Sequence, residues 1–124
     1  MAFLYADAKE TPRSVSLEQA TALVVAALPT KTKQLPEFGI EQFGEDQHSQ
    51  FYFLTAYWQG APNGSMIIGN YAVDPSTGDV WDAVMECSEL NTRALRKLQK
   101  RIRREIGLSD SEYKKIKSKG LLCQ

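Results

Sequence analysis

The chain has 124 residues, of which 43% are apolar and 24% charged, so its composition excludes a wholly disordered chain. Its length suits one domain, because two units of half the size would have cores too small for stability. The net charge of zero hides an asymmetry: residues 1–90 hold four Lys or Arg against twelve Asp or Glu, whereas residues 91–124 hold eleven against three.

The N-terminal part predicts an arm followed by a helix. Residues 1–15 are polar and without a hydrophobic period, and they lack the basic start and long apolar stretch of an intact signal peptide. Ser16 and Gln19 have the spacing of a capping box, which predicts a helix from residue 17 to about 28. A polar loop is expected from Pro29 to Pro36. The buried stripe of the helix is expected to comprise Leu17, Ala20, Leu23, Val24, Ala27 and Leu28.

The middle of the chain predicts strands. Residues 38–43 fit a short strand, and the aromatic-rich residues 51–58 fit a longer one. Asn63-Gly64 is a hairpin signal, after which residues 66–73 fit a third strand. Residues 74–79 form a second turn, and Val80 begins a last short strand. The pattern therefore predicts a meander of three or four antiparallel strands.

The C-terminal third predicts two helices. We expect Ser88 to cap a helix that runs to about Ile106 and ends at Gly107. Ser109 and Glu112 form a second capping box, opening a helix to about Lys119. The sequence thus predicts an α+β fold in a single domain, residues 1–124. It comprises a loose arm (1–15), a helix on a three- to four-stranded antiparallel sheet (16–82), and a basic helical hairpin (88–119).

The two cysteines, Cys87 and Cys123, flank the predicted helical hairpin. A disulfide between them is geometrically possible if the helices are antiparallel, because residues 120–123 can span the difference in helix length. Two reduced, buried thiols are the alternative. A disulfide implies a periplasmic or extracellular protein, and reduced thiols imply a cytoplasmic one. No apolar run approaches the ~20 residues of a membrane-spanning helix.

The sequence shows no recognisable catalytic or metal centre, so we expect neither an enzyme nor a cofactor. His48 and the two cysteines match no zinc spacing, and no nucleophile or phosphate-loop motif is present. Three carboxylates near the turn (Asp74, Asp79 and Asp82) are compatible with calcium, but the full ligand ladder is missing. An Asx-type turn is therefore favoured. Acid–base pairs from Glu37, Glu41 or Asp82 could be proposed, although nothing distinguishes these residues from surface acids.

Basic residues gather on the first C-terminal helix. Their clustering is compatible with phosphate binding through counterion release. Docking on an acidic protein surface and a simple solvated face are the other interpretations, and all three remain open. The residues of this basic surface are Arg93, Arg96, Lys97, Lys100, Arg101 and Arg104.

The segment from Asn70 to Asp82 resembles a strand–turn–strand found in small bacterial domains. These are the PepSY-type domains, the cystatin- or NTF2-like immunity proteins and other toxin-immunity families, and the resemblance extends over residues 16–82. It implies a non-enzymatic immunity protein or inhibitor that binds a bacterial toxin or cell-wall enzyme. A nucleic-acid-binding accessory protein that uses the basic surface is the alternative. The residues expected to bind the protein partner are Trp58, Asp74, Asp79, Trp81 and Asp82.

Overall fold

A computed structural model describes residues 14–42, 51–61, 64–83 and 88–117 of the chain. The predictions made for residues 1–13, for His48, and for Cys87 and Cys123 with their disulfide lie outside these ranges. Within the ranges the fold is α+β, as predicted: a helix, a four-stranded antiparallel sheet and C-terminal helices follow in that order. No described helix has the length and apolar character that crossing a bilayer requires.

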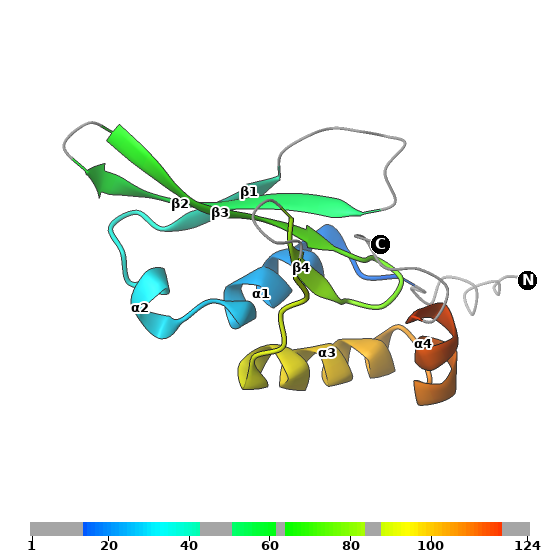
Figure 1. The fold of residues 1–124 in the computed structure, drawn as a ribbon. Coiled ribbons are helices and arrows are strands. Elements are labelled where there is room, and N and C mark those ends of the chain that lie inside the picture. The colour runs from blue at the N-terminus through cyan, green and yellow to red at the C-terminus, as the bar shows by residue number, and fades with distance from the viewer. Residues whose placement is uncertain (1–13, 43–50, 62–63, 84–87, 118–124) are drawn as a thin grey trace, which may run out of the picture.

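The sheet is a simple meander. Its strands are β1 (Gly39–Gln42), β2 (Tyr52–Ala61), β3 (Gly64–Val73) and β4 (Val80–Asp82), and each strand pairs with the next one along the chain. A register shift after Ala56 leaves one extra residue in β3, which is a β-bulge. Strands β2 and β3 are both longer than predicted, and their hairpin extends well past α1 and α3 (Figure 1).

Helix α1 (Leu17–Ala27) begins with the predicted capping box: the Ser16 hydroxyl accepts a hydrogen bond from the Gln19 amide, and the Gln19 side chain accepts one from the Ser16 amide. The predicted apolar stripe is buried from Ala20 onward. Leu17 is instead 39% exposed, because the contact of the stripe with the rest of the protein begins one turn later. The short helix α2 (Thr30–Lys33) was not predicted, and it forms directly after Pro29, a residue that suits a helix start.

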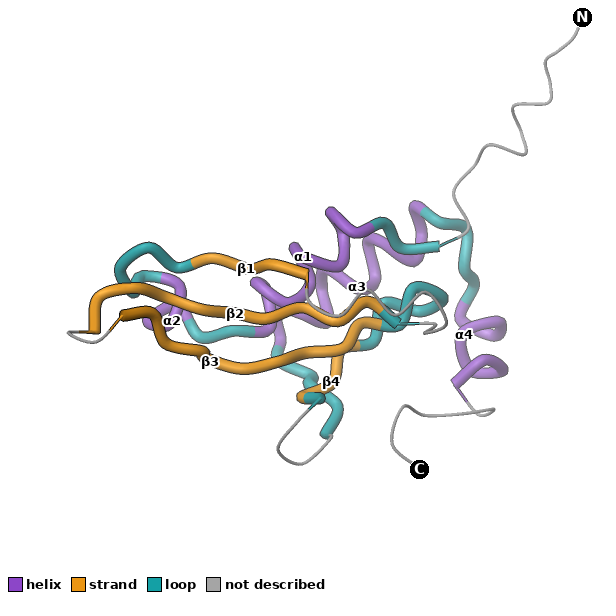
Figure 2. Tube along the Cα trace, turned by 90° about the horizontal axis from the view of Figure 1, so that it is seen from above, coloured by secondary structure: helices purple, strands orange, loops and turns teal. Residues whose placement is uncertain are grey.

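The described helices all lie on one side of the sheet, and α1 lies between the sheet and α3 (Arg93–Glu105) (Figures 1 and 2). The core fills this layer. Side chains alternate along a strand, so Leu54 and Tyr71 point into the core while their neighbours Thr55 and Ala72 point to the opposite face. We call that opposite side, which no described helix covers, the open face.

Helix α3 starts later than predicted. Its N-cap is Thr92, whose hydroxyl accepts a hydrogen bond from the Leu95 amide. The predicted cap, Ser88, lies beside β4 instead: its carbonyl accepts a hydrogen bond from the Asp82 amide, and Leu90 donates to the Val80 carbonyl. The segment 88–90 therefore covers an edge of the sheet that would otherwise have unpaired backbone groups.

Helix α4 (Asp110–Lys117) follows a short connection. Gly107 has a φ of 78°, as expected for a glycine that ends a helix, and Ser109 with Glu112 forms the predicted second capping box. Helix α4 crosses the end of α3 and does not pack along it (Figures 1 and 2).

Candidate functional site

The turn between β3 and β4 is fixed by its own polar groups. The Asp74 carbonyl accepts hydrogen bonds from the amides of Thr77 and Gly78, and the Asp74 carboxylate accepts one from the Ser76 amide. Gly78 has a φ of 80°, which favours glycine. This is the Asx-type turn favoured by the sequence. Burial raises the pKa of Asp74 despite the hydrogen bond from Ser76, and the nearby charge of Asp79 acts in the same direction.

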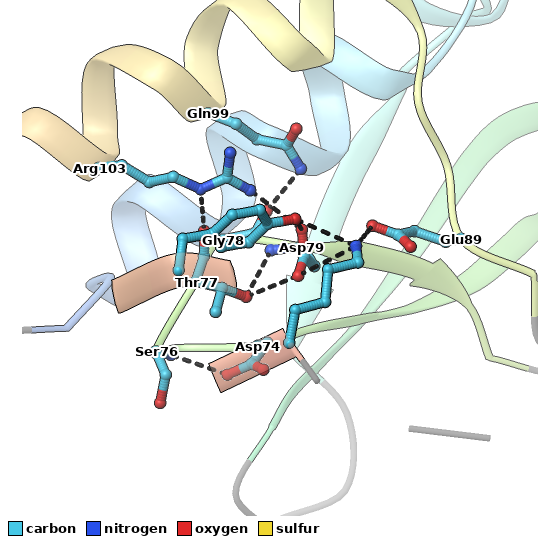
Figure 3. Close-up of polar contacts among 10 residues, drawn as sticks. Asp74, Ser76, Thr77, Gly78, Asp79, Glu89, Gln99 and Arg103 are labelled. Carbon is cyan, nitrogen blue, oxygen red and sulfur yellow. Dashed lines mark hydrogen bonds and ion pairs between the residues drawn. The ribbon is translucent and has the colours of Figure 1, made fainter. Parts of the chain in front are cut away.

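Asp79 ends this turn and is the centre of a buried ionic network (Figure 3). It is 2% exposed. Arg103 of α3 forms a salt bridge with its carboxylate at 3.0 Å, and the Tyr113 hydroxyl of α4 donates a hydrogen bond to it at 2.8 Å. The Thr77 hydroxyl donates a third hydrogen bond at 2.9 Å. The carboxylate is therefore compensated from three directions, as a buried charge requires.

Lys117 extends the network to the segment beside β4. Its ammonium lies 3.7 Å from the Asp79 carboxylate and donates hydrogen bonds to Glu89 and to the Tyr113 hydroxyl. Burial by itself lowers the pKa of Lys117, but these hydrogen bonds and the charge of Asp79 outweigh burial and raise the pKa above its ordinary value of 10.5. Burial also raises the pKa of Tyr113.

Helix α3 holds the backbone of the turn as well. Gln99 donates a hydrogen bond to the Gly78 carbonyl at 2.8 Å, and Arg103 Nε donates one to the Thr77 carbonyl at 2.8 Å (Figure 3). The Arg103 guanidinium also lies 3.9 Å from the centre of the Tyr113 ring, a cation–π contact. Every buried polar side-chain atom among the described residues has a partner. The network therefore acts as an internal clamp that joins the turn, α3, α4 and Glu89.

The predicted partner-binding residues lie in different surroundings, and their role in binding stays a prediction. Asp79 and Trp81 are 2% and 3% exposed, and Trp81 packs edge-to-face on Phe51. Asp74 and Asp82 are half-buried. Trp58 is also half-buried, but it pairs with Met66 near the far end of the hairpin, roughly 20 Å along β3 from the turn.

Two of the carboxylates considered for acid–base chemistry, Glu41 and Asp82, are not brought together. Glu41 is on β1 and Asp82 on β4, the two outer strands of the sheet, which places them about 14 Å apart. Their pairings also put Glu41 on the open face and Asp82 on the helix side. Paired glycosidase carboxylates lie roughly 5–9.5 Å apart. No group of three or more potential metal ligands occurs among the described residues.

The predicted basic surface is exposed along α3. All six of its residues are exposed, and the helix buries Leu95, Gln99 and Ile102 on its other side. Where α3 meets α4, the surface contains a pocket of about 520 Å³ whose lining includes Lys100, Arg104 and Lys114.

The end of the β2–β3 hairpin carries exposed apolar side chains. Ile67 is 62% exposed and Met66 is 45% exposed. Ile67 pairs with Tyr57, and Met66 pairs with Trp58, and both aromatic residues are half-buried. We call these four residues the hairpin end. The two pairs lie on opposite faces of the sheet, because successive side chains of a strand alternate. Exposed apolar side chains mark interaction sites, and Tyr and Trp are frequent anchors of interfaces.

No protein-family model matches the sequence, and no curated protein sequence matches it. The fold does have a counterpart in a solved structure. It is similar to a chain in the structure of a type VI secretion system effector–immunity complex from Pseudomonas protegens, with a TM-score of 0.64 and 24% sequence identity. The similarity covers 85% of this chain and 88% of that chain. At this identity the comparison shows a shared fold.

Sequence reasoning found Trp58 but not the rest of the hairpin end. Met66 and Ile67 have the composition of core strand residues, and no local signal shows that β3 continues past α1 and α3. The clamp around Asp79 was also missed, because Arg103, Tyr113 and Lys117 reach the turn only through the packing of α3 and α4.

Proposed function

We propose that this chain is a non-enzymatic binding protein of the immunity type, which neutralises a bacterial effector toxin by direct contact. The observation that carries the proposal is the fold shared with a chain of a type VI effector–immunity complex over most of both chains. The resemblance of residues 16–82 to immunity and inhibitor domains points the same way. The separation of Glu41 from Asp82 supports binding over carboxylate catalysis.

The hairpin end is the contact surface that the geometry favours. It combines two aromatic side chains with two exposed aliphatic ones on a projecting hairpin. Removing such apolar surface from water is favourable by about 25 cal/mol per Å². A projecting hairpin can also enter a concave surface of a partner, where anchor residues become fully desolvated.

The test is co-expression of this chain with a toxin gene encoded beside its own, followed by growth measurement and co-purification. We expect protection and a stable complex. Ile67→Ser together with Met66→Ser should weaken the complex roughly tenfold or more, in line with the loss of interface anchors. Leu17→Ser is the matched control, because Leu17 is an exposed apolar residue on α1, outside the hairpin end.

Each result has a clear meaning. Growth inhibition by this chain alone would assign it the toxin role and contradict the proposal. Loss of protection after Asp82→Asn, with the complex still intact in co-purification, would indicate catalysis, because binding would then be retained without function. Protection that survives both hairpin substitutions would retain the immunity function and move the interface to another surface.

A further inference from the structure

The two C-terminal helices carry a large excess of positive charge. Together α3 and α4 contain ten Lys or Arg and three Asp or Glu. Arg103 and Lys117 belong to the clamp around Asp79, and Arg101 pairs with Glu105 at 3.9 Å. Within the described part of the chain, no hydrogen bond or ion pair engages the side chains of Lys100, Arg104 and Lys114.

Lys100, Arg104 and Lys114 line one pocket. Its volume is about 520 Å³, and Leu108 and Tyr113 contribute to its wall. Leu108 is half-buried against the core, and Tyr113 is held by its hydrogen bond to Asp79. The clamp therefore positions the Tyr113 part of this wall beside three exposed cations. We call Lys100, Arg104, Leu108, Tyr113 and Lys114 the cationic corner.

We propose that the cationic corner is a docking site for an acidic segment of a protein partner. Carboxylates of the segment pair with Lys100, Arg104 and Lys114, while an apolar side chain of the segment lies against Leu108 and Tyr113. Charge complementarity identifies the occupant, because clustered cations attract acidic partners and reject basic ones. Arg side chains also bind carboxylates in a bidentate geometry.

The structure favours an acidic protein segment over a single-stranded nucleic acid. Single-stranded nucleic acids depend on aromatic faces on which bases stack, and α3 and α4 carry one aromatic residue, Tyr113. The Arg103 guanidinium already covers one face of its ring at 3.9 Å. The Asp110 carboxylate also lines the pocket, and it repels carboxylates and phosphates alike, so it does not distinguish the two occupants.

This site is separate from the hairpin end. The hairpin projects at one end of the molecule and α4 lies at the other (Figures 1 and 2). The inference therefore does not depend on the proposed immunity function, and substitutions at the hairpin end should leave it unaffected.

The experiment uses the full chain and fluorescence anisotropy with three labelled probes: an acidic Glu/Asp peptide with a central leucine, the same peptide with Gln/Asn in place of Glu/Asp, and a thymidine oligonucleotide of matched charge. We expect the acidic peptide to bind the most tightly. Lys100→Ala with Arg104→Ala should weaken its binding roughly tenfold, as expected when charges facing an acidic partner are removed.

Arg93→Ala with Lys97→Ala is the matched control. It removes the same charge from exposed positions of the same helix outside the pocket, and it should weaken binding by less than about threefold, through long-range attraction alone. Equal losses from the two double variants would overturn the proposal, because they would show general charge attraction. Tighter binding of the oligonucleotide would overturn it in favour of a nucleic acid, and failure of the acidic peptide to bind would overturn it outright.

Discussion

The Asp79 carboxylate accepts hydrogen bonds from Thr77 in the turn, Arg103 in α3 and Tyr113 in α4. Removing its charge should leave Arg103 partly buried without its counterion, and Lys117 paired with Glu89 alone. We expect Asp79→Asn to lower the free energy of unfolding by about 3 kcal/mol. This value is at the lower end of the range for breaking a buried ion pair, because the Lys117 side chain is one-third exposed. Urea denaturation followed by circular dichroism measures this change.

Arg101→Gln is the comparison for that variant. It removes an ion pair with Glu105 whose side chains are 65% and 53% exposed, so it should change stability by less than about 0.5 kcal/mol. A similar loss from both variants would show that burial of the Asp79 network contributes nothing special to stability.

At the scale of elements, α4 is held differently from α1 and α3, which both bury apolar side chains. It has no fully buried residue, and it is fastened to the protein by Tyr113 and Lys117 through polar contacts. The pKa of Lys117 is raised in the folded chain. The ion pairs of Lys117 are therefore fully formed below its ordinary pKa of 10.5, and they are lost only as the pH rises through the higher pKa of the folded state. The clamp is therefore closed at neutral pH.

Tyr113→Phe tests this fastening. The variant keeps the ring beside Arg103 but removes the hydroxyl that donates to Asp79, a loss of about 1.5–3 kcal/mol for a hydrogen bond to a charged group. We expect hydrogen exchange of the α4 amides to become roughly tenfold faster or more while that of α1 stays the same. Equal acceleration in both helices would mean that α4 does not open on its own.

The sequence predicted the ends of helices correctly where neighbouring residues determine them. The capping boxes at Ser16 and Ser109 and the left-handed Gly107 are such cases. The start of α3 was wrong because residues 88–90 are drawn to the edge of β4, a contact that no local pattern reveals. The partners of Asp79 in α3 and α4 are also far from it in the sequence, which is why the clamp could not be predicted.

At the scale of the molecule, the sequence predicted the α+β class but not which surfaces stay uncovered. The uneven charge pointed to the basic helices, and α3 does expose these residues. The hairpin end could not be predicted, because apolar strand residues have the same sequence pattern whether a helix covers them or not. Its exposure follows from the length of β2 and β3 relative to α1 and α3.

The order of the strands has a consequence for how the chain folds. Each strand pairs with its sequence neighbour, so the sheet forms from contacts of short sequence separation, which fold fast. The packing of α3 on α1 instead joins residues 17–27 to residues 93–105 and requires the closure of a long loop. We therefore expect the sheet to form before the transition state and α3 to dock after it.

Two buried leucines distinguish the early step from the late one. Leu54 in β2 is 1% exposed and Leu95 in α3 is fully buried, so changing either one to Ala should cost about 2–5 kcal/mol of stability. In stopped-flow experiments Leu54→Ala should mainly slow folding, and Leu95→Ala should mainly speed unfolding. The reverse pattern would mean that the helical layer, and not the meander, nucleates the fold.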